Sequence, residues 1–181
     1  MGFFTNSYVL AFIKFAVLAT FGEILAGSIS RKRLFIPAAL PARMMIWGVL
    51  GIAISFMMKV YYGAMVLMIQ PDLSVFADKL YLAFATSAVM NFTFAPAFML
   101  FHKHTDTYLD LKAAGKRAGL KEICDNIDYH GYIRRVLIIT LPLFWLPAHT
   151  VTFLLPESLR VLFSAILSIV LGLILSVKTK S

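Results

Sequence analysis

The sequence predicts an all-α integral membrane protein, a single membrane domain over residues 1–181 that forms a bundle of five transmembrane helices. Hydrophobic residues make up 60% of the chain and charged residues only 14%, whereas about a quarter of a soluble domain is charged. Five apolar stretches approach the roughly 20 residues that cross a bilayer core as a helix. Lysine and arginine concentrate on one side of those stretches, as expected for membrane spans.

Each apolar stretch is expected to be helical, because in lipid only a helix satisfies all its backbone groups within one segment. The predicted spans are approximately 8–30, 44–69, 80–101, 136–155 and 161–177. The last span is the shortest. The alternative is therefore four spans followed by a re-entrant or interfacial last helix.

The distribution of basic residues predicts the orientation, because short cytoplasmic loops collect Lys and Arg. With five spans, only Lys79 and Arg160 fall on the outer side. The basic residues on the other side are Arg31, Lys32, Arg33, Arg43, seven in the loop 102–135, Lys178 and Lys180. We therefore expect the N-terminus outside, the C-terminus in the cytosol and a cytosolic loop at 102–135.

That loop is expected to hold a short amphipathic helix, because Leu120, Ile123 and Ile127 recur at helical spacing. The net charge of +8 would suggest nucleic acid in a soluble protein. Here the basic residues mark topology, so the expected partner is the lipid bilayer and no nucleic acid. Cys124, the one cysteine, is expected to be a reduced thiol.

Several spans carry a face of small and polar residues, which membrane helices use where they pack together. The clearest recurs every fourth residue in the last span and is predicted to be a packing stripe, with homo-oligomerisation left open: Arg160, Ser164, Ser168, Gly172 and Ser176. The alternative is that such faces line a polar passage. The candidates for pore-lining or polar interior positions are Glu23, Ser55, Lys59, Ser87, Asn91, His149 and Thr152.

The depth of these residues favours a passage. At about 1.5 Å per residue, Lys59 and Asn91 lie roughly 15 and 16 Å below the outer ends of their helices, and His149 about 9 Å. Glu23 lies about 10 Å above the cytosolic end, so it is not level with Lys59. A cation without a level anion requires water, a neutral form or an anionic guest. Three prolines inside spans predict kinks: Pro96, Pro142 and Pro147.

The sequence resembles the family of the Mpv-seventeen protein and the twenty-two-kilodalton peroxisomal membrane protein. The resemblance runs from the first span to Lys178 and lies in Gly22-Glu23, Tyr61-Tyr62, Asn91, Ala95-Pro96, Trp145, Pro147, Phe153, Pro156, Arg160 and Leu175-Ser176. It implies a membrane protein of organelles or, as a bacterial-type relative, of the bacterial cytoplasmic membrane. It also implies a channel of low selectivity for small solutes.

The expected function is therefore a channel or pore for small solutes, anions among them, with Lys59, Asn91 and His149 near the constriction and Glu23 toward the cytosolic mouth. The alternative is a non-conducting structural or assembly protein. We expect no enzyme and no cofactor, because no nucleophile or carboxylate pair has a catalytic setting. His102, His104 and Asp106 supply too few converging ligands to predict a metal site.

Overall fold

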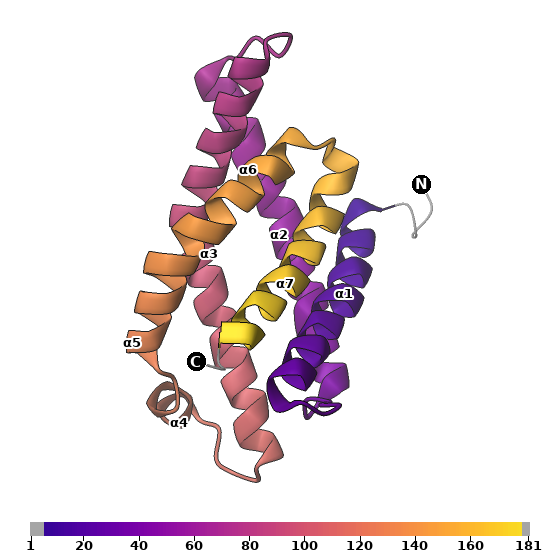
Figure 1. Cartoon of the computed structure of the whole chain (residues 1–181), viewed down its shortest axis with the longest axis vertical. Coiled ribbons are helices and arrows are strands. Elements are labelled where there is room, and N and C mark those ends of the chain that lie inside the picture. The colour runs from indigo at the N-terminus through magenta and orange to yellow at the C-terminus, as the bar shows by residue number, and fades with distance from the viewer. Residues whose placement is uncertain (1–5, 179–181) are drawn as a thin grey trace. The chain divides into compact units, whose positions relative to one another are not determined.

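The computed structural model describes residues 6–178 and the side chains of residues 6–174. This part of the chain is helical, with no strand, as the sequence predicts (Figure 1). Its elements are α1 (Ser7–Arg31), α2 (Leu40–Ile69), α3 (Phe76–Ala113), α4 (Leu120–Asp125), α5 (Tyr129–Gly131), the π-helix η2 (Tyr132–Trp145), α6 (Leu146–Leu154) and α7 (Glu157–Lys178).

Five helical segments are long and apolar enough to cross a membrane, which confirms the predicted fold class. They are Ser7–Arg31, Leu40–Ile69, Phe76–Ala113, Tyr129–Leu154 and Glu157–Ile174. The fourth consists of α5, η2 and α6 in succession. The last segment also meets the requirement by length and composition. This favours five spans over four spans followed by a re-entrant or interfacial last helix. The chain is an integral membrane protein.

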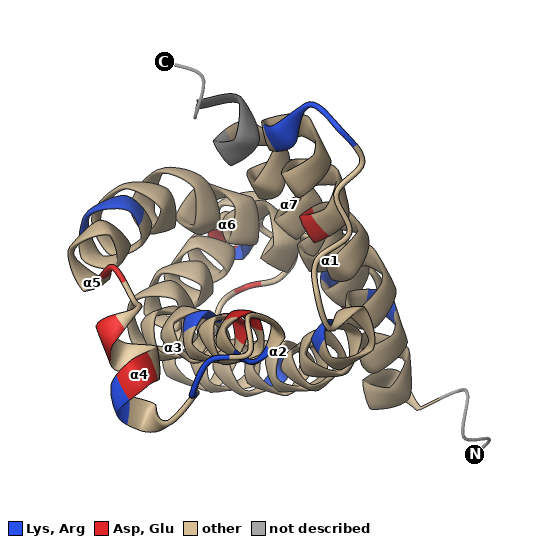
Figure 2. Ribbon diagram, turned by 90° about the horizontal axis from the view of Figure 1, so that it is seen from below, with Lys and Arg blue, Asp and Glu red and all other residues tan. Residues whose placement is uncertain are grey.

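The third helix is longer than the sequence predicts. We expected a loop from residue 102, whereas α3 continues to Ala113. Polarity suggested a loop, but polar residues do not end a helix that has no breaker. The helix ends just before Gly115, which has a φ of +69° in the left-handed region. The short helix α4 lies within the expected amphipathic segment, although Ile127 falls beyond its end. Figure 2 shows charges of both signs on α4, and Lys121 pairs with Asp125 there at 2.6 Å.

The chain divides into two compact units. Unit 1 comprises the chain up to Val60 together with Leu155 onward, and unit 2 comprises Tyr61–Leu154. Unit 1 therefore contains α1, the first two thirds of α2, and α7. Unit 2 contains the end of α2 and the elements from α3 to α6. The single membrane domain stays a prediction.

Close contact between α1 and α7 holds unit 1 together (Figure 1). A Cβ added to Gly172 would lie 3.2 Å from the Ala26 Cβ, and one added to Gly22 would lie 3.1 Å from the Ile169 Cα. Ala165 is fully buried with Phe15 and Ala19. Small residues thus allow the two backbones to approach closely.

The predicted stripe follows this contact only in part. Ser164 is buried and its hydroxyl lies 3.9 Å from the Met58 sulfur, while the Ser168 hydroxyl donates to its own helix at the Ala165 carbonyl. Arg160, at the start of the stripe, is described below with the site. The Ser176 side chain lies outside the described residues.

In unit 2, α3 packs against α6, and the preceding element η2 forms a π-helix for 14 residues. The Thr140 hydroxyl donates to the carbonyl of Arg135, five residues earlier. A π-helix has backbone hydrogen bonds between residues five apart. Such helices are rare and are mostly single turns. Pro142 lies inside η2 and Pro147 just after it, while Pro96 lies inside α3, where its carbonyl accepts from the Tyr132 hydroxyl at 2.5 Å.

Candidate functional site

A pocket of about 410 Å³ lies in unit 1, between one face each of α1, α2 and α7. Its polar lining residues are Ser7, Lys14, Ser55, Lys59, Glu157, Ser158 and Arg160. Two of them, Ser55 and Lys59, are among the pore-lining residues predicted from the sequence. The helical spacing of each group, such as Ser7, Ala11 and Lys14 on α1, explains why one face of each helix contributes. Basic side chains outnumber the single carboxylate.

Lys59 lies level with the beginnings of two neighbouring helices. Its ammonium lies 3.2 Å from the hydroxyl of Ser7, the first residue of α1. It also lies 3.2 Å from a carboxylate oxygen of Glu157, the first residue of α7, and 5.2 Å from the centre of the Tyr8 ring. From the sequence we expected no anion at the depth of Lys59. That expectation was wrong, because the Glu157 carboxylate lies beside the Lys59 ammonium.

Two other polar groups of the pocket have no such partner. Among residues 6–174, the Lys14 ammonium makes no hydrogen bond or ion pair, and the Ser55 hydroxyl is buried without a hydrogen-bond partner. Only 1% of Ser55 is exposed. A cation inside a span and an unbonded buried hydroxyl are both costly unless water or a ligand reaches them.

Arg160 also lines the pocket. It is 9% exposed, and its Nε donates to the Leu155 carbonyl at 3.0 Å, just before the start of α7. This bond fixes the guanidinium near the helix end. The predicted packing residue therefore belongs to the pocket in this unit, where its charge adds to those of Lys14 and Lys59.

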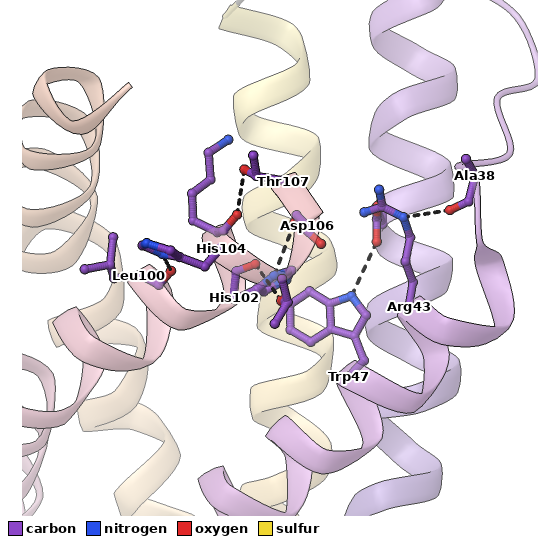
Figure 3. A network of polar contacts seen from close by, with 11 residues as sticks. Ala38, Arg43, Trp47, Leu100, His102, His104, Asp106 and Thr107 are labelled. Carbon is purple, nitrogen blue, oxygen red and sulfur yellow. Dashed lines mark hydrogen bonds and ion pairs between the residues drawn. The ribbon is translucent and has the colours of Figure 1, made fainter. Parts of the chain in front are cut away.

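Glu23 forms a separate polar site at the other end of α1. Its carboxylate accepts from the Arg43 guanidinium at 2.7 Å and from the Trp47 indole nitrogen at 3.4 Å. Arg43 also donates through Nε to the Ala38 carbonyl at 3.0 Å (Figure 3). The Arg43 side chain is only 5% exposed. Glu23 is thus one half of a mostly buried ion pair.

Three predicted residues come together in unit 2. The Asn91 amide nitrogen donates to the carbonyl and hydroxyl oxygens of Ser87 at 2.8 and 3.1 Å, and its oxygen lies 3.2 Å from the Nδ1 of His149. Ser87 in turn donates to the Leu146 carbonyl at 2.8 Å, which links α3 to α6. Trp145 stacks on the His149 ring with 5.0 Å between centroids. Ser87 and Asn91 are fully buried.

Thr152 is also fully buried in unit 2, and its hydroxyl donates to the Ala148 carbonyl at 2.9 Å within α6. Apart from Thr152, the predicted pore-lining set therefore falls into three places. Glu23 lies at one end of α1, Ser55 and Lys59 line the pocket, and Ser87, Asn91 and His149 form what we call the amide–imidazole cluster.

Lys14, Glu157 and Arg43 belong to these sites but were not predicted from the sequence. Lys14 could have been found, because any ionisable residue inside an apolar span suggests a functional position. Glu157 and Arg43 lie at the ends of helices, where charges are expected in any case. Only the relative register of two helices shows that they meet Lys59 and Glu23.

The histidines after Phe101 lie along the extension of α3. The His102 Nδ1 lies 3.2 Å from an Asp106 oxygen, one turn later, and the His104 Nδ1 lies 2.8 Å from the Leu100 carbonyl (Figure 3). The Cys124 sulfur lies 4.0 Å from the His104 Nε2. Among residues 6–174, no three His, Cys, Asp or Glu side chains converge as metal ligands.

Comparisons with models of known protein families, with curated proteins and with solved structures found no match for this chain. Membership of the family that the sequence resembles therefore stays a prediction. The protein is a helical integral membrane protein whose first unit contains a pocket lined by three basic side chains and one carboxylate.

Proposed function

We propose that this protein is a membrane channel of low selectivity for small solutes, with a preference for anions. One observation carries the proposal: the pocket of unit 1, which is lined by Lys14, Lys59 and Arg160 and by a single carboxylate. Its volume of about 410 Å³ is within the range of roughly 300–1,000 Å³ typical of small-molecule sites.

The unpartnered groups support a wet pocket. Keeping the Lys14 ammonium and the Ser55 hydroxyl dry would cost several kcal/mol by order of magnitude. Water in the pocket removes this cost, and a chain of water molecules between helices is the simplest route for a small solute. The excess of positive charge would attract anions into that route and repel cations.

The resemblance to the Mpv-seventeen and twenty-two-kilodalton peroxisomal membrane protein family supports the same function, since some of its members behave as channels. With the N-terminus outside and the C-terminus in the cytosol, the pocket, which includes the first residues of α1 and α7, would face the outer side. Glu23 would lie toward the cytosolic mouth. The solutes and the lipid bilayer are the partners in this proposal.

Planar-bilayer recording of the purified protein tests the proposal. We expect a conductance above that of protein-free lipid, with a reversal potential in a KCl gradient that indicates anion preference. Lys14→Met and Lys59→Met should shift the reversal potential toward cations, whereas Lys79→Met, at an exposed position in unit 2, should not. No conductance, or a selectivity equal in all four proteins, would contradict the proposal.

The second candidate is a non-conducting structural or assembly protein. The amide–imidazole cluster favours it, because two of its hydrogen bonds join α3 to α6 and both Ser87 and Asn91 are buried, as expected of packing contacts. This candidate predicts no conductance, while Ser168→Leu or Gly172→Leu disrupts folding or homo-oligomerisation. Size-exclusion chromatography with light scattering, beside the bilayer recording, separates the two.

A further inference from the structure

We propose that the pocket of unit 1 binds a phosphate group, belonging either to a phospholipid headgroup or to a small soluble phosphate ester. The juxtaposition of Lys14, Arg160 and the unbonded Ser55 hydroxyl between three helices is the observation behind it. The inference deepens the proposed function and rests on it for the route of the ligand, whereas binding is measured without flux.

The charge of the pocket selects an anion. Glu157 lies 3.2 Å from Lys59 and offsets that charge, which leaves Lys14 without a carboxylate in the pocket. Lys14 has no partner of its own among residues 6–174. A cation inside a membrane span normally pairs with an anion or faces a cavity, so a bound anion would complete the arrangement.

The hydrogen-bond donors favour phosphate over carboxylate. Ser55 is 1% exposed and has an unused hydroxyl, and the Ser7 and Ser158 hydroxyls lie at the exposed ends of α1 and α7. The donors therefore come from three helices. A phosphate group presents three or more oxygens to such a set, whereas a carboxylate presents two in one plane.

The position and the walls of the pocket fit a phosphate that is attached to something larger. Ser7 and Glu157 are the first residues of their spans, so the pocket reaches the level at which the apolar part of unit 1 begins. Leu10 and Val161 add an apolar wall. A phospholipid would place its phosphate at this level and its chains along that wall.

Two binding measurements distinguish the sources. Isothermal titration calorimetry in a non-ionic detergent uses glycerol 3-phosphate and inorganic phosphate as soluble probes. Native mass spectrometry uses micelles that contain equal amounts of phosphatidylglycerol and of a diglucosyl diacylglycerol, which has no phosphate. Binding of a soluble probe identifies a soluble ester, and selective retention of phosphatidylglycerol identifies a lipid. Either result supports the inference.

Variants locate the binding in the pocket. A hydrogen bond to a charged group is worth about 1.5–3 kcal/mol, so Lys14→Met should weaken binding at least about tenfold. Ser55→Ala should weaken it several-fold. Glu157→Gln removes the competing carboxylate and should tighten binding, which a merely unfolded variant could not do. Lys79→Met is the matched control outside the pocket and should bind as the wild type does.

The inference is overturned if neither soluble probe binds and phosphatidylglycerol is retained no better than the diglucosyl diacylglycerol. It is also overturned if Lys14→Met, Ser55→Ala and Glu157→Gln all bind as Lys79→Met does. Binding without conductance would refute the channel and leave the phosphate site standing. Conductance without binding would refute the phosphate site and leave the channel standing.

Discussion

Two groups of polar residues inside membrane spans, one in each unit, differ in how their hydrogen bonds are satisfied. In the amide–imidazole cluster of unit 2, Asn91 uses both ends of its amide and Ser87 donates across to α6. In the pocket of unit 1, Ser55 and Lys14 have no partner among residues 6–174. A satisfied cluster fixes helices together, whereas an unsatisfied one requires water or a ligand. Serine occurs in both places, bonded at Ser87 and unbonded at Ser55, so residue type alone does not distinguish packing from binding.

The largest effect is expected where α2 approaches α1 beside the pocket. A Cβ on Gly51 would lie 2.6 Å from the Phe15 Cβ and 2.8 Å from the backbone oxygen of Ala11. Gly51→Ala should therefore push the helices apart and lower the free energy of unfolding by about 3 kcal/mol. Reversible unfolding in mixed micelles, followed by circular dichroism, measures it.

Gly63→Ala is the control for this prediction, because nothing lies within 4 Å of the added Cβ. It should stabilise the helix by about 0.5–1 kcal/mol. Equal effects of the two substitutions would show that the close approach of α1 and α2 is wrong. The walls of the pocket would then need a different arrangement.

The next largest effect is expected in unit 2. Asn91→Ala removes the bonds to Ser87 and leaves the His149 Nδ1 without its amide partner, so we expect a loss of about 2 kcal/mol in the same unfolding assay. Asn126→Ala is the matched control. It is exposed and bonds only within its own segment, to the Glu122 carbonyl, and should cost less than about 0.5 kcal/mol. If both cost the same, the cluster does not hold the helices together.

A pair of serine substitutions compares the two regions directly. Ser87→Ala deletes a donor that is in use and should cost about 1 kcal/mol. Ser55→Ala deletes a buried hydroxyl without a partner, so without phosphate it should leave stability unchanged or raise it. A loss at Ser55 as large as that at Ser87 would mean that Ser55 is bonded in the folded protein.

The smallest effect is expected outside the spans, at Asp128. The Gly131 N–H donates to its carboxylate at 2.8 Å and Arg135 lies 3.1 Å away, and these interactions hold the pKa of Asp128 below its ordinary value of 3.8. Because the pKa is lowered on folding, this stabilisation is complete above about pH 3.8 and is lost as the pH falls through the folded value.

Asp128→Asn keeps an amide oxygen for the cap but removes the titration. The stability difference between wild type and variant should stay constant from neutral pH to about pH 4 and shrink below it. Unfolding midpoints across this pH range measure the difference. A difference that grows in acid would mean that folding raises the pKa of Asp128 instead of lowering it. Unlike Lys14, Asp128 has partners and water, so its substitution should not alter the pocket.

The sequence predicted the fold well because the length and composition of an apolar run are sufficient to indicate a span. It failed at residues 102–113, because polar composition indicates contact with water and not the end of a helix. Leu109 and Leu111, which are buried, were the available sign that the helix continues.

The sites were predicted by residue type but not by partner. Glu23 and Lys59 were singled out as polar positions inside spans, yet Arg43 and Glu157 were not recognised as their partners. Each pair joins different helices, 20 residues apart in the first case. Such a pair depends on how far one helix slides along another. A stripe with a period of four residues fixes which face packs, but not that displacement.

The π-helix has a consequence for the thickness of membrane that this protein matches. The fourth spanning segment has 26 residues, which would measure about 39 Å as a regular α-helix, longer than a hydrocarbon core of about 30 Å. In η2 more residues make up each turn, so the same residues cover less height. Hydrophobic mismatch is thereby reduced without a steep tilt. The extra residues widen the helix around Pro142 instead of lengthening it.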